Sequence, residues 1–275
     1  STSEKVDTAI ETLYEWMFFC AFTDSEFERE RLVIRKEIEK NEANLSRKFY
    51  QMAQNNFYKR HPIKFPVIGY LDNFNTISKE GLVNYYKKYY VPSNMILVVG
   101  GDIDLDRIKE KIKITFGSQE KKAAPQFDFY FEPQPFSNRI IEQEGPTQVS
   151  KMSIKFPTVD LFSKDLYPLD LVDYILGNGD DSLLYKRLIE ETKLAYSINA
   201  SSYTPSFTSG YFEIYVEFEY QNKEKVVEEI KGVLAKLEAG KIKTSDIEKS
   251  KKQKLAEDIF GIQNIEDKVS KYGSS

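Results

Sequence analysis

The stretch from Tyr196 to Phe218 has the sequence YSINASSYTPSFTSGYFEIYVEF. Within it, Phe212, Ile214, Val216 and Phe218 recur at every second position, which is the period of a strand with one buried face. Residues 196–203 form a second strand candidate that precedes it. The stretch therefore predicts a β-hairpin.

Other periodic segments surround this hairpin. A further strand is predicted at 149–156, where Met152, Ile154 and Phe156 alternate with polar residues. Two shorter apolar runs, 95–99 and 139–143, are also interpreted as strands. Three- and four-residue spacing predicts helices, which run from the N-terminus to about 22 and over about 26–45, 46–58, 79–90, 104–117, 164–177, 182–191, 222–239 and 244–259.

Strands and helices that are segregated along the chain, with few strand–helix–strand units, indicate an α+β fold. Residues 118–137 carry three prolines and no periodicity, as is typical of a linker. The predicted organisation is a first domain over 1–117, a linker over 118–137 and a second domain over 138–275. Gly177-Asn178-Gly179 is interpreted as the end of a helix rather than as a phosphate loop.

The composition excludes several classes of function. The 275 residues contain one His and one Cys, so they hold neither a disulfide nor a self-sufficient zinc site, which needs more such ligands. A net charge of −4 with interspersed signs gives no patch for nucleic acid or an anionic membrane. No apolar run reaches the length of a membrane span. We therefore expect a soluble protein, with the cytoplasm slightly favoured.

Two carboxylates on the predicted second helix are candidates for a site. Glu30 and Glu37 are seven residues apart and lie within about 20° of each other on one helical face. Asn44 would continue this stripe by a further seven residues. The alternative interpretation is a solvated face whose charges are paired along the helix, for which the sequence offers Glu26, Arg31, Arg35 and Lys40.

Several separated motifs resemble one known family. They are FERERLVIRKEIEKNEANL over 27–45, FYKRHPIKFPVIGYLDNFNTISKEGLVNYYKKYYVPSNMILVVGGDID over 57–104 and LGNGDDSLLYKRLIEETKLAYSINASSY over 176–203. In this order they are similar to the motifs of the M16 zinc metallopeptidases, the group of insulinase, pitrilysin and mitochondrial processing peptidase. An unrelated α+β binding module would need all these matches to arise by chance.

The resemblance implies roles for three residues. Glu37 matches the third zinc ligand of the family, and Glu30 matches a supporting carboxylate seven residues earlier. Such a carboxylate can orient a ligating His, and a His₂Glu site leaves a position open for water. Tyr196 matches a substrate-binding Tyr, for which the alternative is a strand residue with a buried ring.

This sequence also departs from the family pattern. The inverted HxxEH motif is absent, and His61 lies in a loop that supplies no ligand in the family. The family Arg that accompanies Tyr196 is Ile189 here, and nearby Arg187 should point in a different direction on its helix. In the heterodimeric branch of the family, the zinc motif and the Arg/Tyr pair lie on different subunits, and a chain with the two Glu but without the Arg resembles the zinc-bearing subunit.

These observations give two hypotheses. The first is a fragment of an M16-type zinc metalloendopeptidase, with its first domain truncated before HxxEH, that cleaves peptides or unfolded proteins. Its intact form would bind Zn²⁺ and a second M16 half or subunit, as a homo- or heterodimer, and substrate would add a strand to a sheet edge. The 275 residues alone are expected to bind no zinc and to be inactive. The alternative is a non-catalytic M16-like partner or scaffold subunit that binds peptide or assembles with an active subunit.

Overall fold

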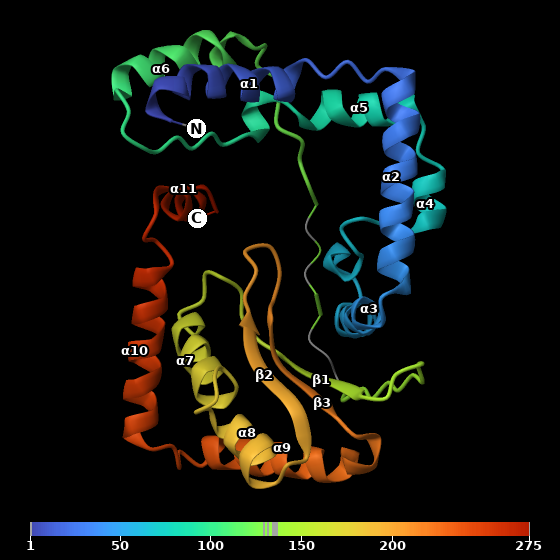
Figure 1. Cartoon of the computed structure of the whole chain (residues 1–275), viewed down its shortest axis with the longest axis vertical. Coiled ribbons are helices and arrows are strands. Elements are labelled where there is room, and N and C mark those ends of the chain that lie inside the picture. Colours follow the sequence, from blue (N-terminus) through green and yellow to red (C-terminus); the bar gives the residue numbers. More distant parts are fainter. Residues whose placement is uncertain (1, 129, 131, 134–136, 275) are drawn as a thin grey trace. The chain divides into compact units, whose positions relative to one another are not determined.

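The computed structural model describes residues 2–128, 130, 132–133 and 137–274 (Figure 1). The chain divides into two compact units. Unit 1 comprises Ser1–Lys40, Ile68–Asp128 and Ile259–Ser275, and unit 2 comprises Asn41–Val67 and Phe129–Asp258. The units group residues by packing in space, and the domain boundaries at 117/118 and 137/138 stay a prediction.

All the regular secondary structure in the described part of unit 1 is helical. The helices are η1 (Ser3–Lys5), α1 (Val6–Phe18), α2 (Asp24–Ala43, whose last turn is counted with unit 2), α4 (Leu71–Asn75), α5 (Lys79–Tyr89), η3 (Pro92–Asn94), α6 (Leu105–Ile114), η4 (Phe116–Ser118) and α11 (Ile265–Ser274). Helix α1 packs on α6, where Ile10 and Ile108 are buried and Arg107 bonds to Asp7 at 2.7 Å. Helix α11, which the sequence did not predict, lies against the extended segment that contains Gly100.

A three-stranded antiparallel sheet is the centre of unit 2. Strands β1 (Ser150–Pro157), β2 (Ala195–Tyr203) and β3 (Tyr211–Phe218) pair in the order β1-β3-β2. The predicted strands at 149–156, 196–203 and 211–218 are thereby confirmed. The helices of this unit are α3 (Leu45–Phe57), η2 (Pro62–Lys64), α7 (Leu166–Leu176), α8 (Leu183–Tyr185), the π-helix η5 (Lys186–Glu191), η6 (Tyr220–Asn222), α9 (Lys223–Glu238) and α10 (Thr244–Phe260, which ends in unit 1).

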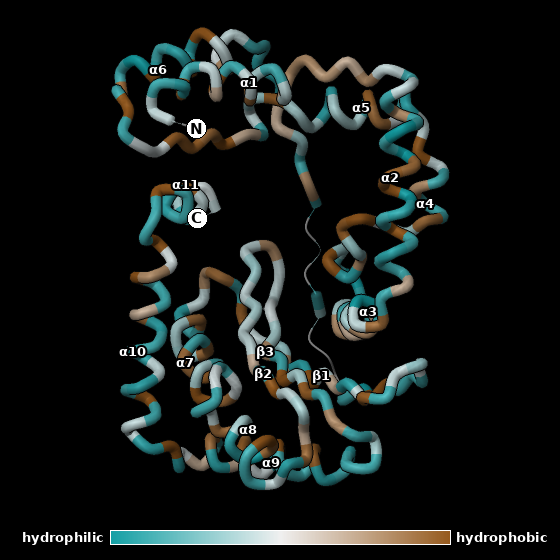
Figure 2. Tube along the Cα trace, viewed as in Figure 1, coloured by the Kyte–Doolittle hydropathy of each residue, from teal (hydrophilic) through white to brown (hydrophobic). Residues whose placement is uncertain are grey.

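The alternation of β3 divides the sheet into two unlike faces. One face is apolar and packs against α7, α8, η5 and α9. This buried cluster consists of Leu176, Leu184, Leu188, Ile198, Ala200, Phe212, Ile214, Val216, Phe218, Val226, Ile230 and Val233. Helix α10, by contrast, is largely hydrophilic along its length (Figure 2). The α+β prediction is confirmed, and the described sheet lies in unit 2.

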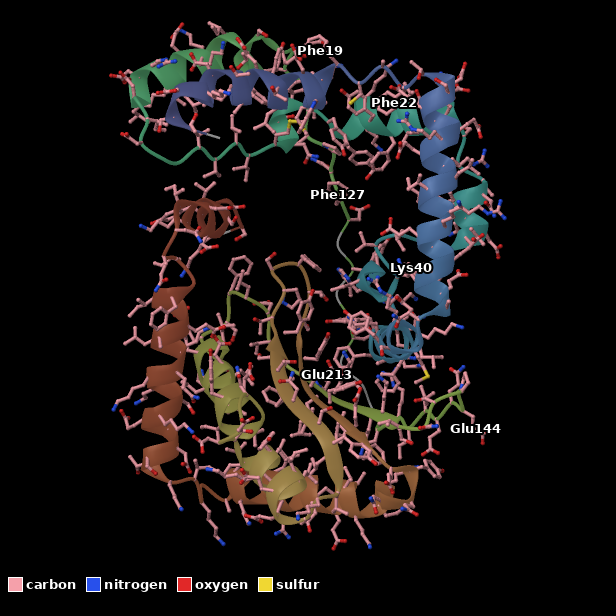
Figure 3. The ribbon with its side chains drawn as sticks, in the orientation of Figure 1. Phe19, Phe22, Lys40, Phe127, Glu144 and Glu213 are labelled. Atoms are coloured by element: carbon pink, nitrogen blue, oxygen red, sulfur yellow. The ribbon has the colours of Figure 1, made fainter. Side chains whose placement is uncertain are left out.

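The other face of the sheet is charged and carries α3. Lys151 pairs with Glu217 across the strands at 2.9 Å, and Lys155 lies opposite Glu213, which is labelled in Figure 3. Helix α3 places Ser46 at 2.9 Å from the Lys151 Nζ and Gln54 at 3.1 Å from the Lys155 Nζ. Polar side chains of α3, β1 and β3 therefore form hydrogen bonds and ion pairs with one another between the helix and the sheet.

Lys155 is the most enclosed of these groups, with 6% of its side chain exposed. Its ammonium lies 3.4 Å from the centroid of the Tyr211 ring and about 6 Å from the rings of Tyr50 and Phe57. Burial lowers the pKa of Lys155 to about 8, although Glu213 acts in the opposite direction. Aromatic faces attract a desolvated cation, so this cage attaches α3 to the sheet.

Three parts of the sequence prediction were wrong. Residues 95–99 and 139–143 form no strand, because no other part of the described chain pairs with them; Ile96 and Ile140 are 85% and 86% exposed. Asn44 does not continue the Glu stripe, since the chain leaves α2 before it and its side chain caps α3 by accepting the Arg47 N–H.

A helix that spans a membrane must be both long and apolar. None of the described helices combines the length and the apolar character that crossing a membrane requires.

Gly177 ends α7, as predicted, and its place against the sheet requires glycine. A Cβ on Gly177 would lie 2.2 Å from the backbone N of Ala200 on β2. We expect Gly177→Ala to lower the free energy of unfolding by about 1–3 kcal/mol, because backbone atoms would have to move. Gly232, on the open side of α9, is the matched control, and Gly232→Ala should raise it by about 0.5–1 kcal/mol. Urea unfolding measures both, and equal effects would contradict the close approach.

The lowered pKa of Lys155 also predicts a pH dependence. Between pH 8 and 10.5 the unfolded chain binds the Lys155 proton more tightly than the folded protein does, so stability should rise with pH. From pH 7.5 to 9.5 the expected gain is about 1–2 kcal/mol in the free energy of unfolding.

Replacement of the lysine tests this assignment. Lys155→Met should abolish the rise, whereas Lys48→Met, at an exposed position of α3, should retain it. Chemical unfolding at several pH values provides the measurement, and a rise that persists in Lys155→Met would exclude Lys155 as its source.

Candidate functional site

The predicted carboxylates Glu30 and Glu37 both lie on α2 and are exposed. Helical rise separates them by about 10 Å along the axis of α2. The helix starts at a capping box, in which Glu26 accepts the Thr23 N–H and Thr23 accepts the Glu26 N–H. Hydrogen bonds from the Thr23 side chain and backbone lower the pKa of Glu26.

Some of the charges along α2 pair as the solvated-face interpretation expects, and others do not. Arg35 bonds to Glu39 at 3.1 Å, and Arg31 lies near Glu28 and donates to the Asn75 carbonyl at 2.9 Å. Among the residues that the structure places, the Glu30 carboxylate bonds to its neighbour Arg29 alone, at 3.0 Å. Within the described chain, the carboxylate of Glu37 has no ion pair or hydrogen bond.

Apolar side chains flank these carboxylates. Val33 is 55% exposed and Ile34 is also exposed, whereas Ile38 on the adjoining side is buried. By helical angle, Val33 and Ile34 lie within about 60° of Glu37. The face that carries Glu30 and Glu37 thus combines carboxylates with exposed apolar surface.

Tyr196 lies in unit 2, on a β-bulge at the start of β2. The pairing shifts between Ala195 and Ser197, so Tyr196 is the extra residue of the bulge, and its side chain is 60% exposed. Its hydroxyl donates to Glu219 at 2.8 Å, and this bond raises the pKa of Tyr196. The alternative of a buried ring is wrong, because the bulge turns the side chain outward.

Ile189, at the position of the family Arg, and the nearby Arg187 both contact other parts of unit 2. Arg187 forms a bidentate pair with Glu229 on α9, at 2.6 and 2.9 Å, and also bonds to Glu191 at 2.8 Å. These partners raise the pKa of Arg187. Ile189 packs against the apolar core of unit 2. Arg187 is therefore already paired, and Ile189 carries no charge, so neither residue supplies an unpaired cation next to Tyr196.

The edge of β2 near its end is covered by α7. The backbone N–H of Ser202 donates to Asp173, and Gly177 abuts Ala200. Burial raises the pKa of Asp173 to about 6. Helix α7 therefore prevents a peptide from adding along the full length of β2.

His61 is buried and has a structural role. Its Nδ1 accepts the Ile63 N–H at 3.2 Å, and its ring stacks on Phe207 with centroids 5.6 Å apart. Burial lowers the pKa of His61, although the charge of Glu132 acts in the opposite direction. The residue belongs to unit 2, whereas Glu37 belongs to unit 1.

The residues present do not fit a complete zinc site. The described residues contain no group of three or more His, Cys, Asp or Glu that could hold a metal ion. The whole sequence has a single His, and its Nδ1 is engaged in the His61 loop. Glu37 can supply one oxygen ligand, and Glu30 can support a ligating side chain.

Three features of these sites could not be predicted from the sequence, because each depends on packing. They are the bulge at Tyr196, the hydrogen bond from Tyr196 to Glu219 and the exposure of Glu37.

Two family models match this chain. Residues 76–254 match the Peptidase M16 inactive domain, and residues 1–69 match the model described as Insulinase (Peptidase family M16). Curated relatives include an uncharacterized zinc protease YmxG of Bacillus subtilis, 24% identical over 99% of this chain and 65% of its own length. A second is the zinc protease PqqE of Helicobacter pylori, 23% identical over 97% of this chain and 61% of its own length.

Solved structures share the fold. A protease from Helicobacter pylori superposes with a TM-score of 0.86 at 22% identity, over 97% of this chain and 65% of that chain. A peptidase M16 inactive domain from Pseudomonas fluorescens gives 0.82 at 17% identity, over all of this chain and 65% of that chain. The chain thus spans about three fifths to two thirds of the length of these relatives.

Proposed function

Because this chain belongs to peptidase family M16, we propose that it is part of a zinc metalloendopeptidase in which Glu37 is a zinc ligand. The enzyme would cleave peptides or unfolded proteins. The observation that carries this proposal is the exposed carboxylate of Glu37, which has no partner among the described residues and shares its helix face with Glu30.

The chemistry of this face supports the proposal. A carboxylate that is exposed and unpaired can bind a metal without first breaking an ion pair. Glu30 would exchange its contact with Arg29 for a ligating His, and exposed ion pairs of this kind contribute only about 0–1 kcal/mol. A zinc ion bound here would polarise a carbonyl and lower the pKa of a bound water.

The two histidines of such a site would come from polypeptide outside these 275 residues. Exposed Val33 and Ile34 offer that polypeptide an apolar surface beside Glu37. Coverage of these two side chains would exclude water near the metal and remove apolar area from solvent. The domain organisation of 1–117, 118–137 and 138–275 is part of the same proposal.

Tyr196 would contact the peptide substrate. Its exposed ring and its hydroxyl, held by Glu219, present both an apolar surface and a polar group at the start of β2. Because Arg187 is bound to Glu229 and Ile189 is packed in the core, a cationic partner for Tyr196 would have to come from a second M16 half or subunit.

A non-catalytic partner subunit is the second candidate. It is favoured by the longer of the two family matches, which is to the inactive domain and covers residues 76–254. In that case the protein would hold peptide or bind an active subunit, and Glu37 would serve no metal.

The proposal can be tested by substitution of Glu37 in the gene of the source organism, followed by purification of the resulting protein. Glu37→Gln keeps the size of the side chain and removes the charge, so zinc affinity should fall by roughly 100-fold or more, and peptidase activity with it. Glu30→Gln should reduce zinc affinity by about 10–100-fold. Zinc content after dialysis and cleavage of an unfolded protein are the measurements.

Glu42→Gln is the matched control, because Glu42 is exposed on α2 but lies about 140° away from Glu37 around the axis. It should leave zinc and activity unchanged. Zinc content that is retained in Glu37→Gln would remove Glu37 from the site, and a wild-type protein that binds peptide but no zinc would favour the non-catalytic partner.

A further inference from the structure

Glu132 lies in the segment that leads from unit 1 to unit 2 and accepts three consecutive backbone N–H groups. Its Oε1 accepts the Lys59 N–H at 2.5 Å, and its Oε2 accepts those of Arg60 and His61, each at 2.9 Å. Successive N–H groups that converge in this way form an anion-binding nest. Hydrogen bonds to a carboxylate are among the stronger ones in proteins.

The charges around the nest favour the ionised carboxylate. Burial acts to raise the pKa of Glu132, but the hydrogen bonds from His61, Lys59 and Arg60 outweigh it, so the pKa lies below its usual value. Lys59 is also close enough to Arg139 and Lys64 to be affected by their charges, and Tyr58 by the charge of Glu132. At neutral pH the nest therefore holds an anion among cations.

The nest is formed by contacts that do not involve Glu132. Tyr58 is fully buried, and its hydroxyl donates to the Ser209 carbonyl at 3.1 Å. On the other side of the nest, the His61 ring stacks on Phe207 and its Nδ1 accepts the Ile63 N–H. The three N–H groups are thus fixed at both ends by the core of unit 2.

The same segment is attached to unit 1 a few residues earlier. Phe127, labelled in Figure 3, stacks on Tyr89 of α5 with ring centroids 5.7 Å apart. Five residue steps separate Phe127 from Glu132, which corresponds to an extended length of at most about 18 Å. Among the described residues, the next hydrogen bond after Glu132 is that of Arg139 to the Asn56 carbonyl, twelve steps from Phe127 and up to about 43 Å along an extended chain.

We propose that Glu132 is a latch whose carboxylate reversibly fastens this segment to a preformed nest at 59–61, so that the described attachments on either side of the unit boundary lie five rather than twelve residue steps apart along the chain. The latch is closed at neutral pH. Since the pKa of Glu132 is lowered, the latch opens only when the pH falls through that lowered value.

Hydrogen exchange of the three amides tests the latch. In Glu132→Ala, exchange at Lys59, Arg60 and His61 should become roughly tenfold faster or more, because each amide loses its acceptor. Glu144→Ala is the control: Glu144, also labelled in Figure 3, is an exposed glutamate of the same unit, and its replacement should leave these rates unchanged. Unchanged exchange in Glu132→Ala would overturn the proposal.

Acetate added to Glu132→Ala tests the preformed nest. Acetate should enter the nest and slow exchange at the three amides, whereas chloride at the same ionic strength should not. Failure of acetate to slow exchange would contradict a preformed nest. If Glu132→Ala does not fold, acidification of the folded wild-type protein supplies the same test, and amides that stay protected below the pKa of Glu132 would contradict the latch.

Discussion

The cation of Lys155, enclosed between α3 and the sheet, is the interaction on which the arrangement of unit 2 most depends. Desolvation of an ammonium is unfavourable by several kcal/mol unless other groups compensate. Here Tyr211, Glu213 and Gln54 provide that compensation from two different elements. Loss of any one partner would leave a buried charge, so the position of α3 is specified more sharply than apolar packing alone would specify it.

This constraint extends to the loop that follows α3. Because α3 is held on the charged face, Tyr58 and His61 reach the β2–β3 loop and pack against Ser209 and Phe207. The nest for Glu132 is formed there. The single His of the sequence is engaged in this packing through its ring and its Nδ1, and Glu37 on α2 is the chain's candidate zinc ligand.

Periodicity predicted most of the local structure. The helices α2, α5 and α9 and the hairpin β2–β3 follow from patterns within single segments. Residues 95–99 have the composition of a strand, but strand formation needs a partner, and no pattern within the segment can supply one. Asn44 shows a similar limit, since the same residue can extend a helix face or cap the next helix, and only the path of the chain distinguishes them.

The features that bear on function were visible in part. The spacing of Glu30 and Glu37 identified them, and family resemblance gave them roles. Their exposure, the binding of Arg187 to Glu229 and the outward turn of Tyr196 depend on contacts between distant residues. The bond from His61 to Glu132 joins residues 71 positions apart, which no local pattern encodes.

The proposed function depends on coordination of a zinc ion by an oxygen of Glu37, with the other ligands supplied from outside these residues. Anomalous diffraction at the zinc absorption edge, from crystals of the protein purified from its source organism, can locate that ion. We expect a zinc peak about 2.0–2.2 Å from a carboxylate oxygen of Glu37. A zinc ion bound elsewhere, or a Glu37 side chain that points away from the metal, would contradict it.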